Sequence, residues 1–493
     1  MLVSCSEMRA IEERAFAAGL TAEALMEDAG RQIARAVHQF IPRPGMCIVF
    51  FGKGHNGGDA LVAARHLQRN GWQLQFRAAF AQEDWSELTL VQFSRIAPEG
   101  EGERPLLLST PPLVVLDGLL GTGAGGTLRE PVRGACRELN RLRRENHAHV
   151  FALDLPSGLD GDSGAADADA VVADVTLTIG LPKAGLVADS AVRHVGRLAV
   201  LPLEGLPVEE AEHATTVTTP RALVPLLPRR AFDVHKGNCG RVGIFAGSPG
   251  LTGAAVICAE GAVRGGAGLV SLYVPQTVHA IVAAQTSPEV MVRPLDQPLA
   301  LAEMDRDVLA IGPGLGRENG GAVLKLIAQA AQPMILDADA LNIVASDLTV
   351  LDWCAGPRLL TPHPGEMARL DPDSTHSSRR GTAEKFTARF PHTLLLKGAR
   401  SIIAERGRGH SYNPTGHPGL ATGGIGDALT GLLAALVAQG LSLYDAARLG
   451  AWLIGRAAEL AIASGRDSAE SLRATVVLDH FGRAFHELRG GGY

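Results

Sequence analysis

Short apolar segments alternate with helical stretches twice along the chain, and this double alternation leaves few possible folds. In the first half, a helical pattern over residues 7–40 precedes apolar runs at 46–52, 73–80, 113–119, 149–156, 174–180 and 197–203. The alternation restarts with runs at 241–247, 268–275, 307–314, 333–340, 358–363 and 392–398. Short apolar strands separated by helices predict a parallel sheet with helices on both faces. Each half is therefore predicted to be a three-layer α/β/α unit.

The segment between the two alternations is predicted to be a linker. Residues 204–220 are acidic, rich in threonine and bounded by prolines, and they show no periodicity. A chain of 493 residues is also too long for one ordinary core. We therefore predict two domains, residues 1–210 and residues 215–493.

The charge and the cysteine content exclude several classes of protein. The net charge is −6 and no basic block occurs, so nucleic acid is not an expected partner. The six cysteines form no CxxC pair and no Cys/His cluster, which argues against disulfides or zinc and favours a reducing compartment. Charged residues interrupt the N-terminal segment, and no apolar run approaches bilayer length. We expect a soluble cytoplasmic protein without a signal peptide or membrane contact.

Three glycine-rich clusters follow predicted strands of the first half, which is where parallel α/β sheets bind ligands. They are FGKGHNGGDA (51–60), LDGLLGTGAGG (116–126) and LDLPSGLDGDSG (153–164). A helix cap at Asn56 or Asp59 and a plain flexible loop over 116–126 are the simpler explanations. The alternative is a crevice for an anionic ligand, a cation or both, lined by Asn56, Asp59, Asp117, Asp154 and Ser157.

In this order, the three clusters resemble the YjeF N-terminal family, the NAD(P)H-hydrate epimerases, over roughly residues 1–205. The resemblance implies a Rossmann-like domain that acts on NADHX or NADPHX, which are reduced nicotinamide cofactors with a water added to the ring. It also implies a potassium ion at Asn56, Asp117 and Ser157. The implied substrate-binding residues are His55, Asn56, Gly57, Gly58, Asp59, Gly121, Thr122, Gly123, Ala124, Gly125, Gly126, Thr127 and Asp154.

Two positions depart from the pattern of that family. His55 stands where asparagine is usual, and Ala60 stands where glycine is usual. We expect activity in spite of both changes, with an altered substrate affinity. Inverting the hydrated carbon requires a proton to be added and removed, and Asp154 is the candidate acid/base.

The strongest signal in the chain is NPTGHPGLATGGIGDALTG at 413–431. Three glycines at 423, 424 and 426 precede a predicted helix over 427–440, with Asp427 in its first turn. Amides at a helix start bind anions, and a carboxylate beside them can deprotonate a hydroxyl next to a transferring phosphoryl group. The simpler explanation is that Asp427 only caps the helix.

Other polar clusters of the second half also follow predicted strands. They lie at 312–316, 336–342, 361–366 and 394–401. Lys397 offers a compact ammonium for a nucleotide. His363, between two prolines, fits a ligand contact and a structural role equally well.

The loop GGIGD is the type that ribokinase-like kinases carry, and the ordered motifs over roughly residues 215–490 resemble one branch of them. That branch is the ADP/ATP-dependent NAD(P)H-hydrate dehydratases, with HKGNCGRVGIFAGS, TPHPGEMARL and LLKGARSII among the shared motifs. The resemblance implies a ribokinase-like fold and magnesium with ADP or ATP. Implied hydrate-binding residues are Ala255, Gly316, His363 and Asp427, and implied nucleotide-binding residues are Lys397, Gly398, Ala399, Arg400, Ser401 and Gly426.

Together the two resemblances imply a metabolite-repair enzyme. It would interconvert the R and S forms of NADHX and NADPHX and dehydrate the S form at the expense of ADP or ATP, giving NAD(P)H, phosphate and AMP or ADP. The expected partners are these small molecules and further copies of the chain in a homo-oligomer. The alternatives are a ribokinase-family small-molecule kinase with an N-terminal binding module, and an inert scaffold in the first half.

Overall fold

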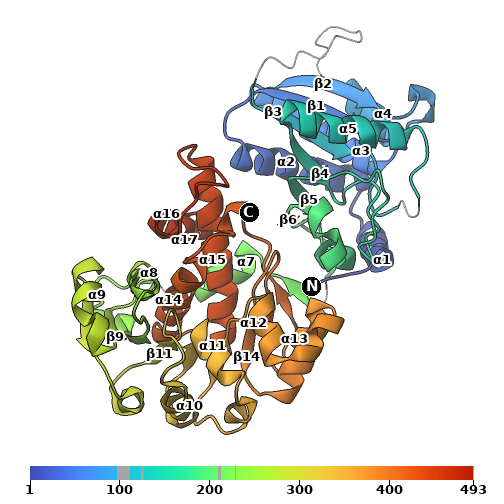
Figure 1. The fold of residues 1–493 in the computed structure, drawn as a ribbon. Coiled ribbons are helices and arrows are strands. Elements are labelled where there is room, and N and C mark those ends of the chain that lie inside the picture. The colour runs from blue at the N-terminus through green and yellow to red at the C-terminus, as the bar shows by residue number, and fades with distance from the viewer. Residues whose placement is uncertain (97–110, 124–126, 209–212, 228, 492–493) are drawn as a thin grey trace. The chain divides into compact units, whose positions relative to one another are not determined.

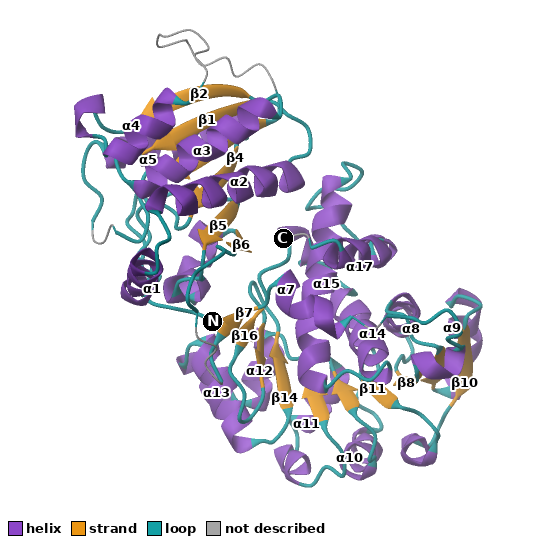
Figure 2. Ribbon diagram, turned by 180° about the vertical axis from the view of Figure 1, so that it is seen from behind, coloured by secondary structure: helices purple, strands orange, loops and turns teal. Residues whose placement is uncertain are grey.

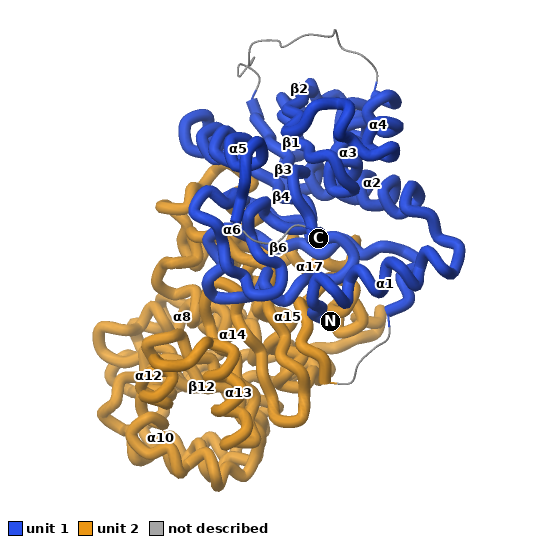
Figure 3. Tube along the Cα trace, turned by 90° about the vertical axis from the view of Figure 1, so that its right-hand side faces the viewer, with its two compact units in different colours: residues 1–211, 493 blue, residues 212–492 orange. Residues whose placement is uncertain are grey.

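The computed structural model describes all residues except 97–110, 124–126, 209–212, 228 and 492–493 (Figure 1). The chain divides into two compact units, unit 1 with residues 1–211 and unit 2 with residues 212–492 (Figure 3). Each unit has its own sheet and its own apolar core. Among the described residues, no helix combines the length and the apolar character needed to cross a membrane.

Unit 1 contains a six-stranded parallel sheet in the order β2-β1-β3-β4-β5-β6. Each apolar run of the first half forms one strand: β1 (Met46–Phe51), β2 (Gln73–Ala78), β3 (Leu113–Gly118), β4 (His149–Leu153), β5 (Val175–Ile179) and β6 (Arg197–Leu201). The helices are α1 (Cys5–Ala17), α2 (Ala22–Phe40), α3 (His55–Arg69), α4 (Glu87–Ser94), α5 (Val132–Asn146) and α6 (Val192–Val195). The helical pattern over 7–40 is thus two helices, because Gly19 turns the chain between them at a φ of 98°.

Helices cover both faces of the unit 1 sheet, as a parallel sheet requires (Figure 2). Val49 of β1 packs in one apolar cluster with α2 and α3, whereas its neighbours Ile48 and Phe50 pack in another cluster with α5. Successive residues of a strand point to opposite faces. The sheet is therefore the middle layer of a three-layer unit, as predicted.

Unit 2 contains a ten-stranded sheet in the order β10-β9-β8-β11-β12-β13-β14-β15-β16-β7. The strands are β7 (Thr216–Val217), β8 (Arg241–Phe245), β9 (Leu269–Val274), β10 (Val290–Pro294), β11 (Val308–Ile311), β12 (Met334–Leu336), β13 (Arg358–Leu360), β14 (Thr393–Leu396), β15 (Ile402–Ala404) and β16 (Ser411–Tyr412). The helices are α7 (Pro220–Leu223), α8 (Thr252–Arg264), α9 (His279–Gln285), α10 (Gly320–Gln329), α11 (Asp339–Val344), α12 (Pro364–Leu370), α13 (Arg379–Arg389), α14 (Ile425–Ala438), α15 (Leu443–Ala463), α16 (Ala474–Asp479) and α17 (Phe481–Arg489).

Four strands of unit 2 were not predicted: β7, β10, β15 and β16. Strand β7 lies inside the expected linker 204–220, so that interpretation is wrong for the end of the segment. The Thr216 N–H donates to the His410 carbonyl (2.8 Å), and the Thr218 N–H donates to the Tyr412 carbonyl (2.9 Å). Backbone pairing of this kind leaves no alternating apolar pattern in a strand of two residues.

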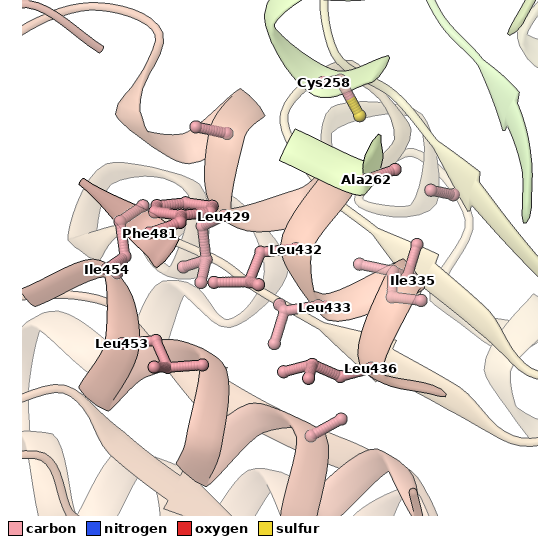
Figure 4. Packing of buried hydrophobic residues seen from close by; sticks show 14 of the residues in the cluster. Cys258, Ala262, Ile335, Leu429, Leu432, Leu433, Leu436, Leu453, Ile454 and Phe481 are labelled. Carbon is pink, nitrogen blue, oxygen red and sulfur yellow. The ribbon is translucent and has the colours of Figure 1, made fainter. Parts of the chain in front are cut away.

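Helix α14 is the centre of the unit 2 core. Its residues Leu432, Leu433 and Leu436 pack in one cluster with Leu453 of α15 and Phe481 of α17 (Figure 4). A helix that is apolar on all sides is typical of a buried helix. Helix α14 begins at Ile425 rather than at residue 427, with Gly424 as its N-cap, and it carries Asp427 in its first turn.

Candidate functional sites

The candidate residues of unit 1 gather where the strand order of the sheet reverses. The chain runs from β1 to β2 on one side of β1 and then to β3 on the other side. Ligands bind at such a switch point, beyond the carboxyl ends of the strands. Asn56 follows β1, Asp117 lies near the end of β3, and Asp154 and Ser157 follow β4. The structure thus brings these four residues to the same edge of the sheet.

Asp117, Ser157 and Asn56 form one linked, oxygen-rich group. The Ser157 hydroxyl donates to Asp117 Oδ1 (2.6 Å), and the Ser157 N–H donates to Asp117 Oδ2 (2.8 Å). Leu120 joins Asn56 to this pair, because its N–H donates to Ser157 Oγ (3.0 Å) and its carbonyl accepts from Asn56 Nδ2 (2.8 Å).

The side-chain oxygen of Asn56 is the main evidence for a cation site in unit 1. Asn56 Oδ1 is buried and has no hydrogen-bond partner among the described residues, although buried acceptors are normally satisfied. Burial raises the pKa of the nearby Asp117 carboxyl to about 6, against the lowering effect of its hydrogen bonds from Ser157, and a bound cation would favour the ionised form. Carbonyl, carboxylate and hydroxyl oxygens are ligands for hard cations. These residues therefore fit a hard cation.

Asp154 occupies an unusual backbone position and is paired with a buried lysine. Its φ of 65° lies in the left-handed region, which is uncommon for a residue other than glycine and is often found at functional sites. Lys183, only 1% exposed, donates to Asp154 Oδ1 and to the Ile179 carbonyl. The Ile179 N–H donates to the same carboxylate oxygen (3.2 Å). Sequence reasoning missed Lys183, although its place shortly after β5 was an available signal.

Two further carboxyl groups, those of Asp59 and Glu12, lie close enough to Asp154 and Lys183 for these charges to change their pKa values. Burial raises the pKa of Asp59 of α3 well above its usual value, and the charges of Asp154 and Glu12 raise it further. Burial also raises the pKa of Glu12 of α1, with Lys183 opposing the shift. The site therefore combines one ion-paired carboxylate with two carboxyl groups whose pKa values burial raises. Glu12 was not predicted from the sequence, because α1 carries no glycine-rich motif.

The glycines of the 51–60 cluster have packing roles of their own. A Cβ on Gly57 would lie 2.1 Å from the Gly52 carbonyl oxygen, and one on Gly58 would lie 2.5 Å from Met26 of α2. The N-cap of α3 is Gly54, which makes no side-chain capping bond, so the simpler explanation of a cap at Asn56 or Asp59 is wrong. These glycines bring α3 close to β1 and α2, and this places Asn56 and Asp59.

The two departures from the family pattern are accommodated differently. Ala60 fits because Gly118 has no side chain: a Cβ on Gly118 would lie only 2.5 Å from the Ala60 Cβ. His55 is exposed at the first position of α3. Of the second glycine cluster, Gly121 lies beside Asn56, Thr122 is half-buried, and Gly123 and Thr127 are exposed; Ala124, Gly125 and Gly126 lie outside the described residues.

Unit 2 has a switch point of its own between β8 and β11. The chain runs from β8 to β9 and β10 on one side and returns to β11 on the other. Gly316 follows β11, and its N–H donates to Asp339 Oδ2 (2.9 Å). Ala255 is fully buried near the start of α8, where a Cβ on Gly247 would lie 3.0 Å from it.

Asp337, directly after β12, connects the elements of the unit 2 site. Its carboxylate accepts hydrogen bonds from Lys397 Nζ (2.7 Å), Thr361 Oγ1 (2.9 Å) and Thr430 Oγ1 (2.9 Å). A Cβ on Gly426 would lie 3.4 Å from both Lys397 Nζ and Asp337 Oδ2. The start of α14, the lysine and the aspartate are therefore adjacent. Asp337 was not among the predicted site residues, although the motif LDADALN marks the strand end that carries it.

Asp427 has the protonation behaviour expected of a general base. Burial and the charge of Asp337 raise the pKa of its carboxyl to about 7, with Lys397 opposing the shift. A base is most effective when its pKa lies near the working pH. The N-cap of α14 is Gly424, in the left-handed conformation, so the simpler explanation that Asp427 only caps the helix is wrong.

His363 has the structural role that the sequence left open. Its Nδ1 accepts from the N–H groups of Gly365 (2.9 Å) and Glu366 (3.3 Å), and Glu366 Oε2 accepts from the His363 N–H (2.8 Å). This reciprocal pair caps α12. About half of the side-chain surface of His363 (51%) stays exposed, so the ring can also contact a ligand.

Comparison with known proteins identifies the family to which this chain belongs. A model described as YjeF-related protein N-terminus matches residues 22–185, and a model described as NAD(P)H-hydrate dehydratase matches residues 242–477. A bifunctional NAD(P)H-hydrate repair enzyme of Moorella thermoacetica is 36% identical and is matched over 93% of this chain and 92% of its own. The chain belongs to the family of bifunctional NAD(P)H-hydrate repair enzymes.

Other members of this family and one solved structure extend the comparison. The enzyme of Coxiella burnetii is 34% identical over 96% of this chain and 97% of its own. The Bacillus subtilis ADP/ATP-dependent NAD(P)H-hydrate dehydratase, co-crystallised with ATP and Mg²⁺, is 29% identical and has a TM-score of 0.50; the match covers 56% of this chain and 100% of that one. In the part of the present chain that the structure describes, no three His, Cys, Asp or Glu side chains are grouped to hold a metal ion.

Proposed function

We propose that this chain repairs hydrated nicotinamide cofactors with two active sites. Unit 1 interconverts the R and S forms of NADHX and NADPHX, and unit 2 dehydrates the S form with ADP or ATP. The observation that carries the proposal is Asp427, whose raised pKa and place beside the amides at the start of α14 suit a base next to a phosphoryl group. Family membership and the matched Bacillus subtilis structure support the same chemistry.

In unit 2, the chain's own groups would activate a poor leaving group. Asp427 takes the proton of the ring hydroxyl while that oxygen bonds to the terminal phosphorus, and the bond from this phosphorus to its bridging oxygen breaks, which releases AMP from ADP or ADP from ATP. The carbon–oxygen bond of the phosphorylated hydrate then breaks. Phosphate leaves, and loss of a proton from the adjacent carbon restores the dihydropyridine. Magnesium on the nucleotide would neutralise part of the phosphate charge.

The binding residues of unit 2 follow from this arrangement. Lys397 and Gly426 lie next to each other and would contact the nucleotide, together with Gly398, Ala399, Arg400 and Ser401 in the turn after β14. The hydrate would lie between the start of α14 and the loops after β11 and β13. Its proposed contacts are Ala255, Gly316, His363 and Asp427.

In unit 1, Asp154 is the proposed acid/base. Lys183 holds its carboxylate at the strand end, and Asp59 has a raised pKa that suits a proton donor on the same site. A base and an acid in the same site can remove and return a proton in one cycle. A potassium ion at Asn56, Asp117 and Ser157 would fix the loops around the substrate, and the unsatisfied Asn56 Oδ1 supports this site.

Two broader expectations accompany this proposal. All six cysteines are free and five of them are buried, which agrees with action in a reducing compartment such as the cytoplasm. Homo-oligomerisation stays a prediction from the sequence.

The proposal is tested by supplying mixed NADHX epimers, ADP and magnesium, and by following the recovery of reduced-nicotinamide absorbance. The wild-type chain should recover all of the cofactor. Asp427→Asn should abolish recovery while the R and S forms still interconvert, and Asp154→Asn should limit recovery to the S form initially present. A stable phosphoester as the product would instead indicate a kinase. If either substitution stopped both reactions in a folded protein, the assignment of one reaction to each unit would be wrong.

A further inference from the structure

The turn that connects β14 to β15 has an unusual backbone. It comprises Lys397 to Ser401, and Gly398 and Arg400 have φ values of 152° and 61°. Positive φ at a residue such as arginine requires support from the surrounding structure. The turn lies beside the start of α14, because a Cβ on Gly426 would be 3.4 Å from Lys397 Nζ.

The support comes from Arg379, the first residue of α13. Its Nη1 donates to the carbonyls of Ala399 (3.0 Å) and Arg400 (3.3 Å). Its Nη2 donates to the carbonyls of Leu396 (3.2 Å) and Lys397 (3.3 Å). One planar guanidinium group therefore binds four carbonyls, one at the end of β14 and three in the turn, which its fixed fork of donors permits and a lysine ammonium does not.

Gly398 is required for this contact. A Cβ at position 398 would lie 2.7 Å from Arg379 Nη2 and 2.9 Å from its Cζ. Any side chain there would push the guanidinium away from the turn. Gly398 therefore permits both the unusual φ and the close approach of the Arg379 guanidinium.

Carbonyls that point toward Arg379 fix the direction of the amides between them. In a planar trans peptide, the C=O of one residue and the N–H of the next point in opposite directions. The Gly398 N–H shares a peptide group with the Lys397 carbonyl, and the Ser401 N–H shares one with the Arg400 carbonyl, and both of these carbonyls are bound to Arg379. Neither N–H forms a hydrogen bond with described residues. Both amides point away from the Arg379 guanidinium and stay open to an acceptor, and open backbone N–H groups in a turn can bind anions.

We propose that Arg379 is a positioning residue for the nucleotide: by binding the carbonyls of the 397–401 turn, it presents the Gly398 and Ser401 amides to anionic oxygens of ADP or ATP. This inference rests on the proposed dehydratase function of unit 2. Arg379 itself does not touch the nucleotide. Without it, the turn has to be ordered on binding, and that entropy cost reduces affinity for the nucleotide.

The test compares Arg379→Ala and Arg379→Lys with the matched control Arg380→Ala, which removes the exposed arginine next along α13. KM for ADP, KM for the S hydrate and kcat are measured on the full chain, together with ADP binding by calorimetry. Both Arg379 variants should raise KM and Kd for ADP about tenfold or more, with less than about a twofold change in KM for the hydrate. Arg380→Ala should change neither. Gly398→Ala, which displaces the guanidinium, should reproduce the effect on ADP.

The epimerase reaction of unit 1 serves as an internal control for intact protein. If Arg379→Ala leaves the Kd for ADP unchanged, or weakens both substrates equally, the inference is overturned. If the wild-type chain itself shows no ADP-dependent dehydration, the proposed function fails instead. Because calorimetry reads ADP binding without turnover, these two failures can be told apart.

Discussion

At the scale of single residues, Asp427 should set the pH range of dehydration. Burial and Asp337 raise the pKa of its carboxyl to about 7, Asp339 and Glu366 raise it further, and Lys397 opposes them. A general base works only when ionised, so kcat/KM for the hydrate should be low at acid pH, rise through about pH 7 and level off above it. A pH profile of recovery, with nucleotide and magnesium saturating, measures this.

The charge of Asp337 explains part of the raised pKa, so its removal should move that profile. Asp337→Asn removes a like charge beside Asp427 and leaves Lys397 less neutralised, and both changes favour the ionised form of Asp427. The acid limb should shift to lower pH. Asp445→Asn on α15, where the carboxylate pairs with Arg448, should leave the limb in place. An unchanged limb in Asp337→Asn would contradict this account of the pKa.

The candidate side chains could be predicted at this scale, but their partners could not. Asn56, Asp117 and Ser157 each lie in a glycine-rich motif after a strand, and the parallel sheet brings such strand ends together. Lys183 and Arg379 lie outside those motifs. Lys183 meets Asp154 across 29 positions, and Arg379 meets Leu396 and the 397–401 turn across 17 to 21 positions. Contacts of this range depend on the packing of whole elements, which local sequence patterns do not record.

At the scale of elements, the contact between α8 and α14 places Asp427, the proposed catalytic carboxylate. A Cβ on Gly431 of α14 would lie 1.9 Å from the Cys258 carbonyl oxygen, and one on Gly261 of α8 would lie 2.4 Å from the Ala428 carbonyl oxygen. Each glycine thus lets the backbone of the other helix approach. The sequence predicted a helix over 427–440, but it did not show which glycines make the close contact.

Gly431→Ala should therefore separate the two helices. Overpacking of this kind costs about 1–3 kcal/mol, and the shift also moves the first turn of α14 away from Asp337. Thermal unfolding should occur at a lower temperature, and dehydration should fall while epimerisation persists. Gly321→Ala in α10 is the control, because a Cβ there meets nothing within 4 Å and alanine favours a helix. Equal stability of the two variants would show that the helix contact tolerates a methyl group.

At the scale of the whole molecule, the chain consists of two units with separate cores. The repeated alternation of strands and helices was enough to predict this, because each alternation supplies one complete sheet. The seam was harder to place. Strand β7 pairs with β16, and Val217 is 6% exposed, so the end of the expected linker belongs to unit 2. A two-residue strand at a sheet edge is defined by its backbone partners and not by its composition.

This placement of β7 leads to a prediction about separated units. A fragment of residues 1–211 should epimerise NADHX alone, and a fragment that begins at residue 213 should dehydrate only the S form, with complete recovery when both fragments are mixed. A fragment that begins at residue 219 lacks the hydrogen bonds of Thr216 and Thr218 and the burial of Val217. It should lose on the order of 2 kcal/mol or more and unfold at a lower temperature than the fragment that begins at 213. Calorimetry of both fragments measures the difference. Equal unfolding temperatures would mean that β7 adds nothing to unit 2, and that the whole of 204–220 acts as the linker its composition suggested.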